Sequence, residues 1–281
     1  MSELLAAIEA PIAYLAPHIS RAAHLVYPPV SGRALVRPEQ EYRTMRIVDC
    51  RGNVPQPTIT TAGFELATAP TTVTDLYDDD AVRAYYYPEI VALLKRLLGA
   101  TAVVVFDHNQ RSATRAAAGQ RGVRTPVAAA HVDYTPSSGP RRAHEILESA
   151  GLAALAEHRL ALVNVWRPIV GPVQDMPLAL CDARSTARCD FVETDIHHFG
   201  EDDLERPRHT GQIYSLRHNP EHRWYYVSDM QADEVLLLQN WNSADTAHRG
   251  YMPHTGFRHP AAPVDCRPRE SIEARTLVIY P

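Results

Sequence analysis

Apolar residues recur at helical spacing between residues 82 and 98. This segment follows an acidic run at residues 78–80 and precedes Gly99. Acidic side chains favour a helix N-terminus and glycine commonly ends a helix, so the pattern predicts a helix here, split or kinked at Pro88. A second helix is predicted over residues 141–158, where apolar residues again share one face. We expect both helices to pack against the core rather than carry chemistry.

The other apolar segments are short and fit strands better than helices. Few helical segments separate them, which favours an antiparallel double sheet over alternating strands and helices. The sequence therefore predicts an all-β core with flanking helices, folded as a double-stranded β-helix, a cupin-like jelly roll. The predicted core strands cover residues 101–106, 126–131, 160–166, 178–181, 212–216, 224–227, 234–239 and 271–280.

The first part of the chain has a different pattern. It is rich in proline and lacks long helical periodicity, although residues 46–49 and 63–66 are predicted as short strands. We interpret residues 1–75 as an N-terminal extension packed on the core. Residues 76–281 then form the double-stranded β-helix, and the whole chain is one structural domain.

Composition narrows the function classes. The 281 residues are 45% hydrophobic with a formal charge of −5, which does not favour binding to nucleic acid or anionic membranes. No apolar segment approaches the roughly 18 residues of a membrane span, and the first residues lack a signal-peptide pattern. The four cysteines show no C-x-x-C spacing and are expected to be reduced thiols. We expect a cytoplasmic protein.

A metal site is predicted from three widely separated residues. His131 and Asp133 are two apart on a predicted strand, so their side chains share one face. This short pattern is common by chance, and it gains weight because His254 and then Arg269 and Ser271 follow in order. Two imidazoles and one carboxylate occupy one face of Fe(II) and leave three positions open. A 2-oxo acid can fill two of these positions and dioxygen the third.

The predicted cosubstrate anchor lies at the start of the last strand. The far carboxylate of a 2-oxo acid needs a bidentate cation and a hydroxyl, which Arg269 and Ser271 provide from one strand face. Arg275 lies on the same face and is an alternative anchor. His248 and His259 flank His254 and are alternatives for the third metal ligand.

The sequence also resembles a family of bacterial and fungal hydroxylases and desaturases that includes the gibberellin desaturase and a cephamycin 7α-methoxylation protein. The resemblance runs from about residue 64 to residue 279. It implies a double-stranded β-helix, Fe(II), 2-oxoglutarate and O2, with oxidation of an unactivated C–H bond in a small molecule of secondary metabolism. The matching stretches are residues 87–89 (YPE), 105–108 (VFDH) with Arg111, 131–134 (HVDY), 164–168 (NVWRP), 177–182 (PLALCD), 222–226 (HRWYY), 233–234 (DE), 253–254 (PH) and 269–275 (RESIEAR).

Carried over by position, this resemblance assigns His131, Asp133 and His254 as iron ligands and Arg269 as the 2-oxoglutarate anchor. The chain departs from the family pattern at residues 240–243 (NWNS), where similar proteins often carry a Tyr-Asp-Ser-like segment. This departure concerns the substrate more than the metal.

Several residues beside the predicted site are candidate substrate contacts. Asn164 and Trp166 share one strand face, while Arg167 points to the other. Arg111 and Tyr134 lie next to other predicted site residues. The sequence does not choose among hydroxylation, desaturation and ring formation, and it predicts no oligomeric state. Two other functions stay open: a metal-dependent hydrolase and a non-catalytic partner of a biosynthetic enzyme. An oxygenase of this kind can also need a partner protein.

Overall fold

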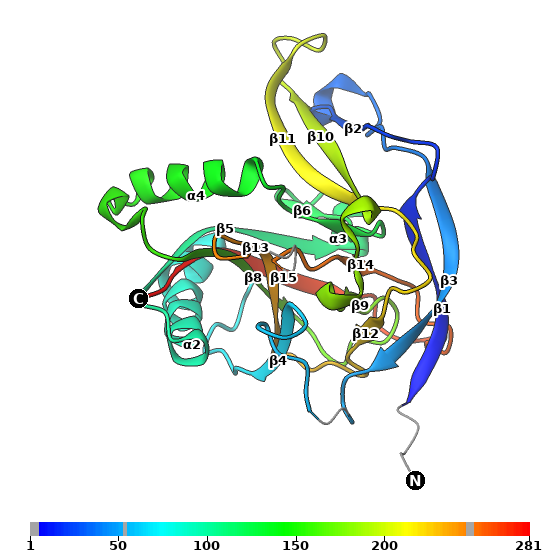
Figure 1. Cartoon of the computed structure of the whole chain (residues 1–281). Helices are drawn as coiled ribbons and strands as arrows, with labels where there is room; N and C mark the ends of the chain where they lie inside the picture. Colours follow the sequence, from blue (N-terminus) through cyan, green and yellow to red (C-terminus); the bar gives the residue numbers. More distant parts are fainter. Residues whose placement is uncertain (1–5, 53–54, 246–249) are drawn as a thin grey trace.

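The computed structural model describes residues 6–52, 55–245 and 250–281 (Figure 1). Within these ranges most regular structure is β-strand, arranged in one nine-stranded and one six-stranded sheet. The two sheets face each other across a shared apolar core that also includes helix α4 (Ser138–Ser149). This is the arrangement expected for a double-stranded β-helix.

The larger sheet contains strands from the whole length of the chain. Its order is β1-β3-β12-β9-β14-β7-β11-β10-β2. The strands are β1 (Ala7–Leu15), β2 (Ala22–Val26), β3 (Gln40–Asp49), β7 (His131–Val132), β9 (Leu178–Cys181), β10 (Phe191–Phe199), β11 (Pro207–Leu216), β12 (Trp224–Tyr226) and β14 (His254–Gly256). In Figure 1 the β10–β11 hairpin projects from the body of the molecule, and β2 lies beside it.

The smaller sheet carries most of the polar side chains discussed below. Its order is β4-β13-β8-β15-β5-β6. The strands are β4 (Phe64–Thr68), β5 (Ala102–Ser112), β6 (Val123–Arg124), β8 (Leu160–Pro168), β13 (Glu234–Asn242) and β15 (Glu270–Ile279). The short helices are α1 (Asp79–Ala81), α3 (Ala113–Ala117), the π-helix η2 (Val82–Tyr86) and the 3-10 helices η1 (Pro29–Ser31), η3 (Ala153–Leu155), η4 (Ala183–Ser185) and η5 (Arg188–Asp190).

The predicted helix over residues 82–98 is present with the expected ends. Asp78 caps it by accepting hydrogen bonds from the backbone N–H groups of Asp80 and Ala81. The chain then forms η2 and α2 (Tyr87–Leu98), and Gly99 ends α2 in the left-handed conformation with φ of 65°. Pro88 lies in the first turn of α2, where its missing N–H costs no helical hydrogen bond.

Alternation along β8 explains how the smaller sheet is buried on both sides. Leu160 and Leu162 pack into the core between the sheets, whereas Val163 and Val165 pack in the second apolar cluster. That cluster contains the apolar face of α2, which therefore covers the outer face of this sheet (Figure 1). Asn164 and Trp166 follow Leu162 on the inner face, and Arg167 lies on the opposite, outer face. The sequence predicted this separation but not which face is the inner one.

The N-terminal segment is more closely built into the fold than an extension wrapped around it. β1 and β3 pair over nine residues and continue the larger sheet beside β12, while β2 and β4 each pair with a strand of the core. The predicted strands at residues 46–49 and 63–66 lie in or next to β3 and β4. The described part of this N-terminal segment therefore supplies strands to both sheets.

The prediction differs from the structure at several strands. Of residues 126–131, only the last belongs to a strand, because Pro126 lacks a backbone donor and the segment bonds singly to separate neighbours. Five of the described strands, β1, β2, β6, β10 and β14, were not predicted. The second predicted helix is shorter than expected and is represented by α4 followed by η3. No described helix is long and apolar enough to cross a membrane.

Candidate metal centre

The fold brings His131, Asp133 and His254 together. His131 opens β7, Asp133 follows that strand, and His254 opens β14, directly opposite His131 in the antiparallel pair. One potential ligand atom from each side chain lies within 4.8 Å of the other two. The two imidazole centroids are 4.5 Å apart, and His131 Nε2 is 3.5 Å from Asp133 Oδ1. In the described ranges, no other group of three such side chains meets this spacing.

Backbone contacts orient both imidazoles toward this cluster. His131 Nδ1 lies 2.8 Å from the Ala129 carbonyl, and His254 Nδ1 lies 3.4 Å from the Met252 carbonyl. Because a carbonyl oxygen only accepts, each Nδ1 donates, and in the neutral form of each ring Nε2 then carries the lone pair. A metal ligand is commonly fixed in this way by a hydrogen bond from its other ring nitrogen.

The charges of the three side chains also suit a cation. Burial, together with nearby His131, lowers the pKa of His254 to about 4, so this imidazole is neutral at pH 7. Burial raises the pKa of Asp133, but the two histidines and Arg275 outweigh it and hold that pKa well below its usual range. Burial lowers the pKa of His131, but Asp133 outweighs burial and leaves it above its ordinary value. The cluster thus holds a firmly ionised carboxylate.

Other described histidines lie outside the cluster. His259 packs against the rings of Tyr226 and Phe257 and is not part of the cluster. His222 Nε2 is hydrogen-bonded to Asp190 at 3.0 Å in a buried position. His248 lies outside the described residues.

Arg269 lines a cavity beside the cluster, and both Arg269 and Ser271 carry a buried polar atom that is not used within the described residues. The cavity is lined by all three clustered side chains and by Trp166, Gly256 and Arg269, among others. Arg269 is 4% exposed and donates from Nη1 to the Met176 carbonyl at 2.8 Å. Its Nε and the Ser271 hydroxyl have no hydrogen-bond partner in the described part of the chain. Such donors are costly to bury unless a ligand binds them.

Space for the Arg269 guanidinium is provided by Gly256. A Cβ atom at residue 256 would lie 3.2 Å from Arg269 Nη1 and 2.9 Å from both the Met176 methyl and the Val127 carbonyl oxygen. Arg269 also lies over the Trp166 ring, 5.6 Å from its centroid. Burial, with a contribution from Arg111, lowers the pKa of Arg269 to about 10, so the guanidinium stays charged at pH 7.

Arg275, the alternative anchor, has another partner. Its Nη2 forms a close ion pair with Asp107 on the neighbouring strand β5. Its buried Nε has no hydrogen-bond partner among the described residues. The structure therefore favours Arg269 as the anion-binding arginine.

The candidate substrate residues separate into two groups. Arg111 and Trp166 line the cavity, and Asn164 donates from Nδ2 to Asp133 Oδ2 at 2.7 Å. Tyr134 instead packs in the apolar core between the sheets.

Arg167 is also turned away from the cluster, on the outer face of the smaller sheet. It is 1% exposed and binds the carbonyl oxygens of Ala69 and Ala232 and the Tyr86 hydroxyl. Neither Arg167 nor Tyr134 lines the cavity, so the geometry gives no support to their predicted role as substrate contacts.

Three residues that the sequence analysis did not select contribute to the site. Glu273 lines the cavity, Gly256 makes room for Arg269, and Asn240 Oδ1 accepts a hydrogen bond from the Asp133 backbone N–H at 3.2 Å. Glu273 was accessible to sequence reasoning because it alternates with Ser271 and Arg275 on one strand. Asn240 was not, because its position depends on an irregularity in β13.

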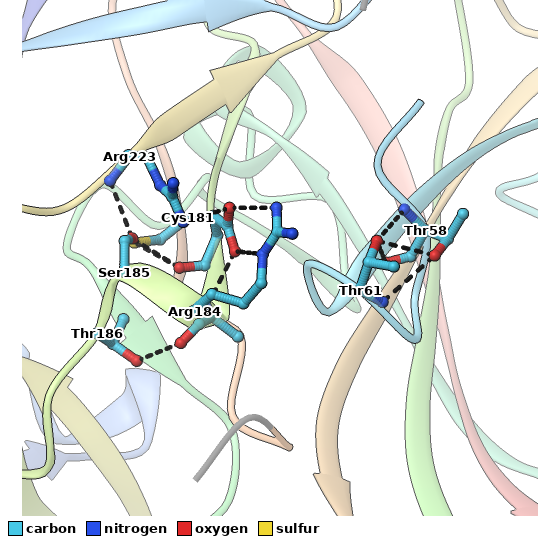
Figure 2. A network of polar contacts seen from close by, with 9 residues as sticks. Thr58, Thr61, Cys181, Arg184, Ser185, Thr186 and Arg223 are labelled. Carbon is cyan, nitrogen blue, oxygen red and sulfur yellow. Dashed lines mark hydrogen bonds and ion pairs between the residues drawn. The ribbon is translucent and has the colours of Figure 1, made fainter. Parts of the chain in front are cut away.

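A polar network next to the cluster fixes the end of β9, the neighbour of β14 (Figure 2). Its centre is Asp182, which is fully buried and accepts hydrogen bonds from the Arg184 side chain at 2.8 and 2.9 Å. Arg223 Nη2 lies 3.0 Å from the same carboxylate. The Ser185 hydroxyl closes the turn by donating to the Asp182 carbonyl at 2.6 Å. Figure 2 also shows the Thr58–Thr61 turn. The network anchors the strand that positions His254.

Comparison with known proteins places this geometry in a family. Residues 12–279 match a family model described as an oxidoreductase/YMDC permease-like domain. The chain is 32% identical over 226 residues to the Fe(II)/2-oxoglutarate-dependent dioxygenase nvfI of Aspergillus novofumigatus, covering 78% of this chain and 77% of that protein. The chain belongs to the Fe(II)/2-oxoglutarate-dependent dioxygenases. The hydroxylase/desaturase efuI of Hormonema carpetanum is 30% identical, with 85% of each chain covered.

Solved structures agree with this family. The iron and alpha-ketoglutarate-dependent endoperoxidase NvfI superimposes with a TM-score of 0.80 at 26% identity, covering 98% of each chain. The predicted jelly roll, the oxidoreductase class and the requirement for Fe(II), 2-oxoglutarate and O2 are thereby confirmed for this dioxygenase. The observed cluster of two histidines and one aspartate also fits the facial triad that Fe(II) oxygenases use.

Proposed function

We propose that His131, Asp133 and His254 bind Fe(II) in this dioxygenase, and that Arg269 with Ser271 binds the distal carboxylate of 2-oxoglutarate. The main support for the proposal is the cluster itself, in which one ring nitrogen of each histidine and one oxygen of an ionised carboxylate lie within 4.8 Å of one another. Backbone carbonyls orient both imidazoles. The second support is the pair of buried donors without partners on Arg269 and Ser271. Iron with 2-oxoglutarate and O2 supplies an oxidant able to break an unactivated C–H bond.

The protein side chains bind, orient and shield rather than transfer protons. His254 and His131 offer neutral Nε2 lone pairs when iron binds, and the carboxylate of Asp133 lowers the net charge of the site. Arg269 is held by the Met176 carbonyl and by the Trp166 ring, so its remaining donors stay directed to the cavity. This fixed orientation supports bidentate binding of a carboxylate.

We place the substrate on the side of the cavity lined by Arg111 and Glu273, which the proposed iron and 2-oxoglutarate contacts leave unused. Trp166 contributes an apolar wall. The substrate is a small molecule of secondary metabolism, as the family resemblance implies, and its oxidation gives hydroxylation, desaturation or ring formation. Need for a partner protein and a cytoplasmic location stay predictions from the sequence.

The proposal is tested by anaerobic titration of the apoprotein with Fe(II) and then 2-oxoglutarate. A weak visible charge-transfer band reports a 2-oxo acid chelated to iron. We expect the band in the wild type and in His259→Ala, a nearby histidine outside the cluster, and no band in His254→Ala. A band of full strength in His254→Ala would refute the ligand assignment.

Arg269 separates this proposal from a hydrolytic metal site, the other enzymatic interpretation of the same three ligands. A hydrolase needs a metal-bound water and has no use for a 2-oxoglutarate anchor. We expect Arg269→Ala to retain Fe(II) and to lose 2-oxoglutarate affinity, with loss of succinate production. Unchanged 2-oxoglutarate binding in that variant would show that another residue is the anchor.

A further inference from the structure

The two carboxylate oxygens of Asp133 have different neighbours. Asn164 Nδ2 donates to Oδ2 at 2.7 Å, whereas Oδ1 lies 3.5 Å from His131 Nε2 at the proposed metal position. An ionised carboxylate only accepts, so chemistry requires the amide nitrogen of Asn164 to be the donor. Asn164 is 1% exposed, on the inner face of β8. One oxygen of Asp133 is thus bound by protein, and the other is left for the metal.

The backbone of Asp133 is held by a second asparagine. Asn240 Oδ1 accepts from the Asp133 N–H at 3.2 Å, and Asn240 Nδ2 contacts the Leu238 carbonyl at 3.4 Å. In the pairing of β13 with β8, the register shifts between Gln239 and Trp241, so Asn240 is the extra residue of a β-bulge. Bulges re-aim a side chain locally. Asn240 is fully buried and reaches the residue next to the end of β7.

We propose that Asn164 and Asn240 form an asparagine clamp that fixes Asp133 as a ligand through one oxygen only. The inference rests on the proposed function, because it takes Asp133 as an iron ligand. Asn164 binds Oδ2 and prevents the carboxylate from chelating the metal through both oxygens. Asn240 fixes the backbone from which that side chain projects.

The clamp has a consequence for cosubstrate binding. A facial triad leaves three positions open, and 2-oxoglutarate and O2 together need all three. A carboxylate that binds through both oxygens takes one of these positions. Asn164 is therefore a positioning residue that protects 2-oxoglutarate binding as well as iron binding. Because an amide is neutral, it does this without adding charge to the buried site.

The same substitution at the two positions distinguishes their roles. Asn164→Asp keeps the shape of the side chain but removes the donor, so we expect Fe(II) affinity to fall about 10- to 100-fold, the usual effect of losing an outer contact to a metal ligand. Asn240→Asp keeps the accepting oxygen, so we expect its Fe(II) affinity to stay within about threefold of wild type. Asn240→Ala removes the acceptor, so we expect its Fe(II) affinity to fall as far as that of Asn164→Asp. Affinity is measured with Fe(II) alone under anaerobic conditions, followed by 2-oxoglutarate titration.

Asn219→Ala is a matched control. Asn219 donates to the buried carboxylate of Asp190 at 3.1 and 3.2 Å, away from the metal cluster. Its loss removes the same kind of hydrogen bond, and we expect wild-type Fe(II) and 2-oxoglutarate affinity. Circular dichroism checks folding of each variant. If Asn164→Asp does not fold, Asn164→Leu removes the donor without adding charge and has the same expected outcome.

Two results would overturn the clamp. Wild-type Fe(II) and 2-oxoglutarate affinities in Asn164→Asp or Asn164→Leu would show that the donor is not needed. Equal weakening by Asn164→Asp and Asn240→Asp would show that added charge, not the lost donor, causes the effect. Failure of the proposed function has a different signature, because Asp133→Ala would then bind Fe(II) as tightly as wild type.

Discussion

Gly256→Ala tests whether Arg269 is positioned by close packing. Gly256 is the last residue of β14, two residues beyond His254, and its φ is not in the left-handed region. The backbone can therefore accept alanine without torsional strain, and only the new methyl group matters. That methyl would lie 2.9 Å from the Met176 Cε and 2.9 Å from the Val127 carbonyl oxygen, with Arg269 Nη1 at 3.2 Å.

The magnitude follows from which neighbours can move. The Val127 carbonyl accepts the Gly256 N–H at 2.9 Å, so it cannot retreat without weakening a backbone hydrogen bond. The Met176 side chain and the Arg269 guanidinium are the groups free to shift. Overpacking of this kind costs about 1–3 kcal/mol. If the displacement falls on Arg269, that cost corresponds to about a 5- to 150-fold loss of 2-oxoglutarate affinity.

The assay is anaerobic titration of the iron-loaded protein with 2-oxoglutarate, followed through the visible charge-transfer band. Gly211→Ala is the control, because a Cβ at that strand position meets only the Ile196 Cβ at 4.0 Å. We expect Fe(II) affinity to be unchanged in both variants and 2-oxoglutarate affinity to fall in Gly256→Ala alone. A Gly256→Ala protein with wild-type 2-oxoglutarate affinity would refute the argument that this contact positions Arg269.

Three further predictions concern other residues. Arg269→Lys keeps the positive charge but loses the two-pronged guanidinium group. Each lost hydrogen bond to a charged group costs about 1.5–3 kcal/mol. The affinity for 2-oxoglutarate, measured by calorimetry, should therefore fall about 10- to 150-fold. Arg167→Met leaves the Ala69 and Ala232 carbonyls without this donor. Urea denaturation should therefore show a free energy of unfolding lower by about 2–6 kcal/mol, while iron affinity is retained. Unchanged stability would refute a structural role for Arg167. Burial lowers the pKa of His222 despite its bond to Asp190. The unfolded chain therefore binds more protons at this residue than the folded chain does. The free energy of unfolding should fall as the pH drops below about 6.5, and it should fall less steeply in His222→Gln than in the wild type.

The cluster of proposed metal ligands could be predicted from the sequence because a short local motif is followed by further residues in a fixed order. His131 and Asp133 are two apart at a strand end, and His254, Arg269 and Ser271 follow in sequence order. The fold then places β14 next to β7, so one cross-strand pair brings the distant histidine opposite the first. Alternation on β8 was equally readable, and it correctly separated Asn164 and Trp166 from Arg167.

Which face of a buried strand lines the cavity was not readable from the sequence. Both faces of β8 are apolar at Leu162 and Val163, so alternation gave two faces without saying which one meets the metal. Arg167 satisfies its donors with carbonyls from two distant loops, a solution that no local pattern reveals. For the same reason β1 and β2 were missed, since their partners lie far along the chain.

Asn240 shows most clearly where sequence reasoning stops. In a regular strand, side chains alternate, and residue 240 would share a face with Leu238 and Asn242. The bulge breaks this alternation and turns the Asn240 oxygen to the backbone of Asp133. The departure from the family pattern at residues 240–243 was interpreted as a matter of substrate identity. The structure connects Asn240 to the proposed metal ligand through its accepting oxygen, so a relative that lacks such an oxygen at this position should differ in iron affinity.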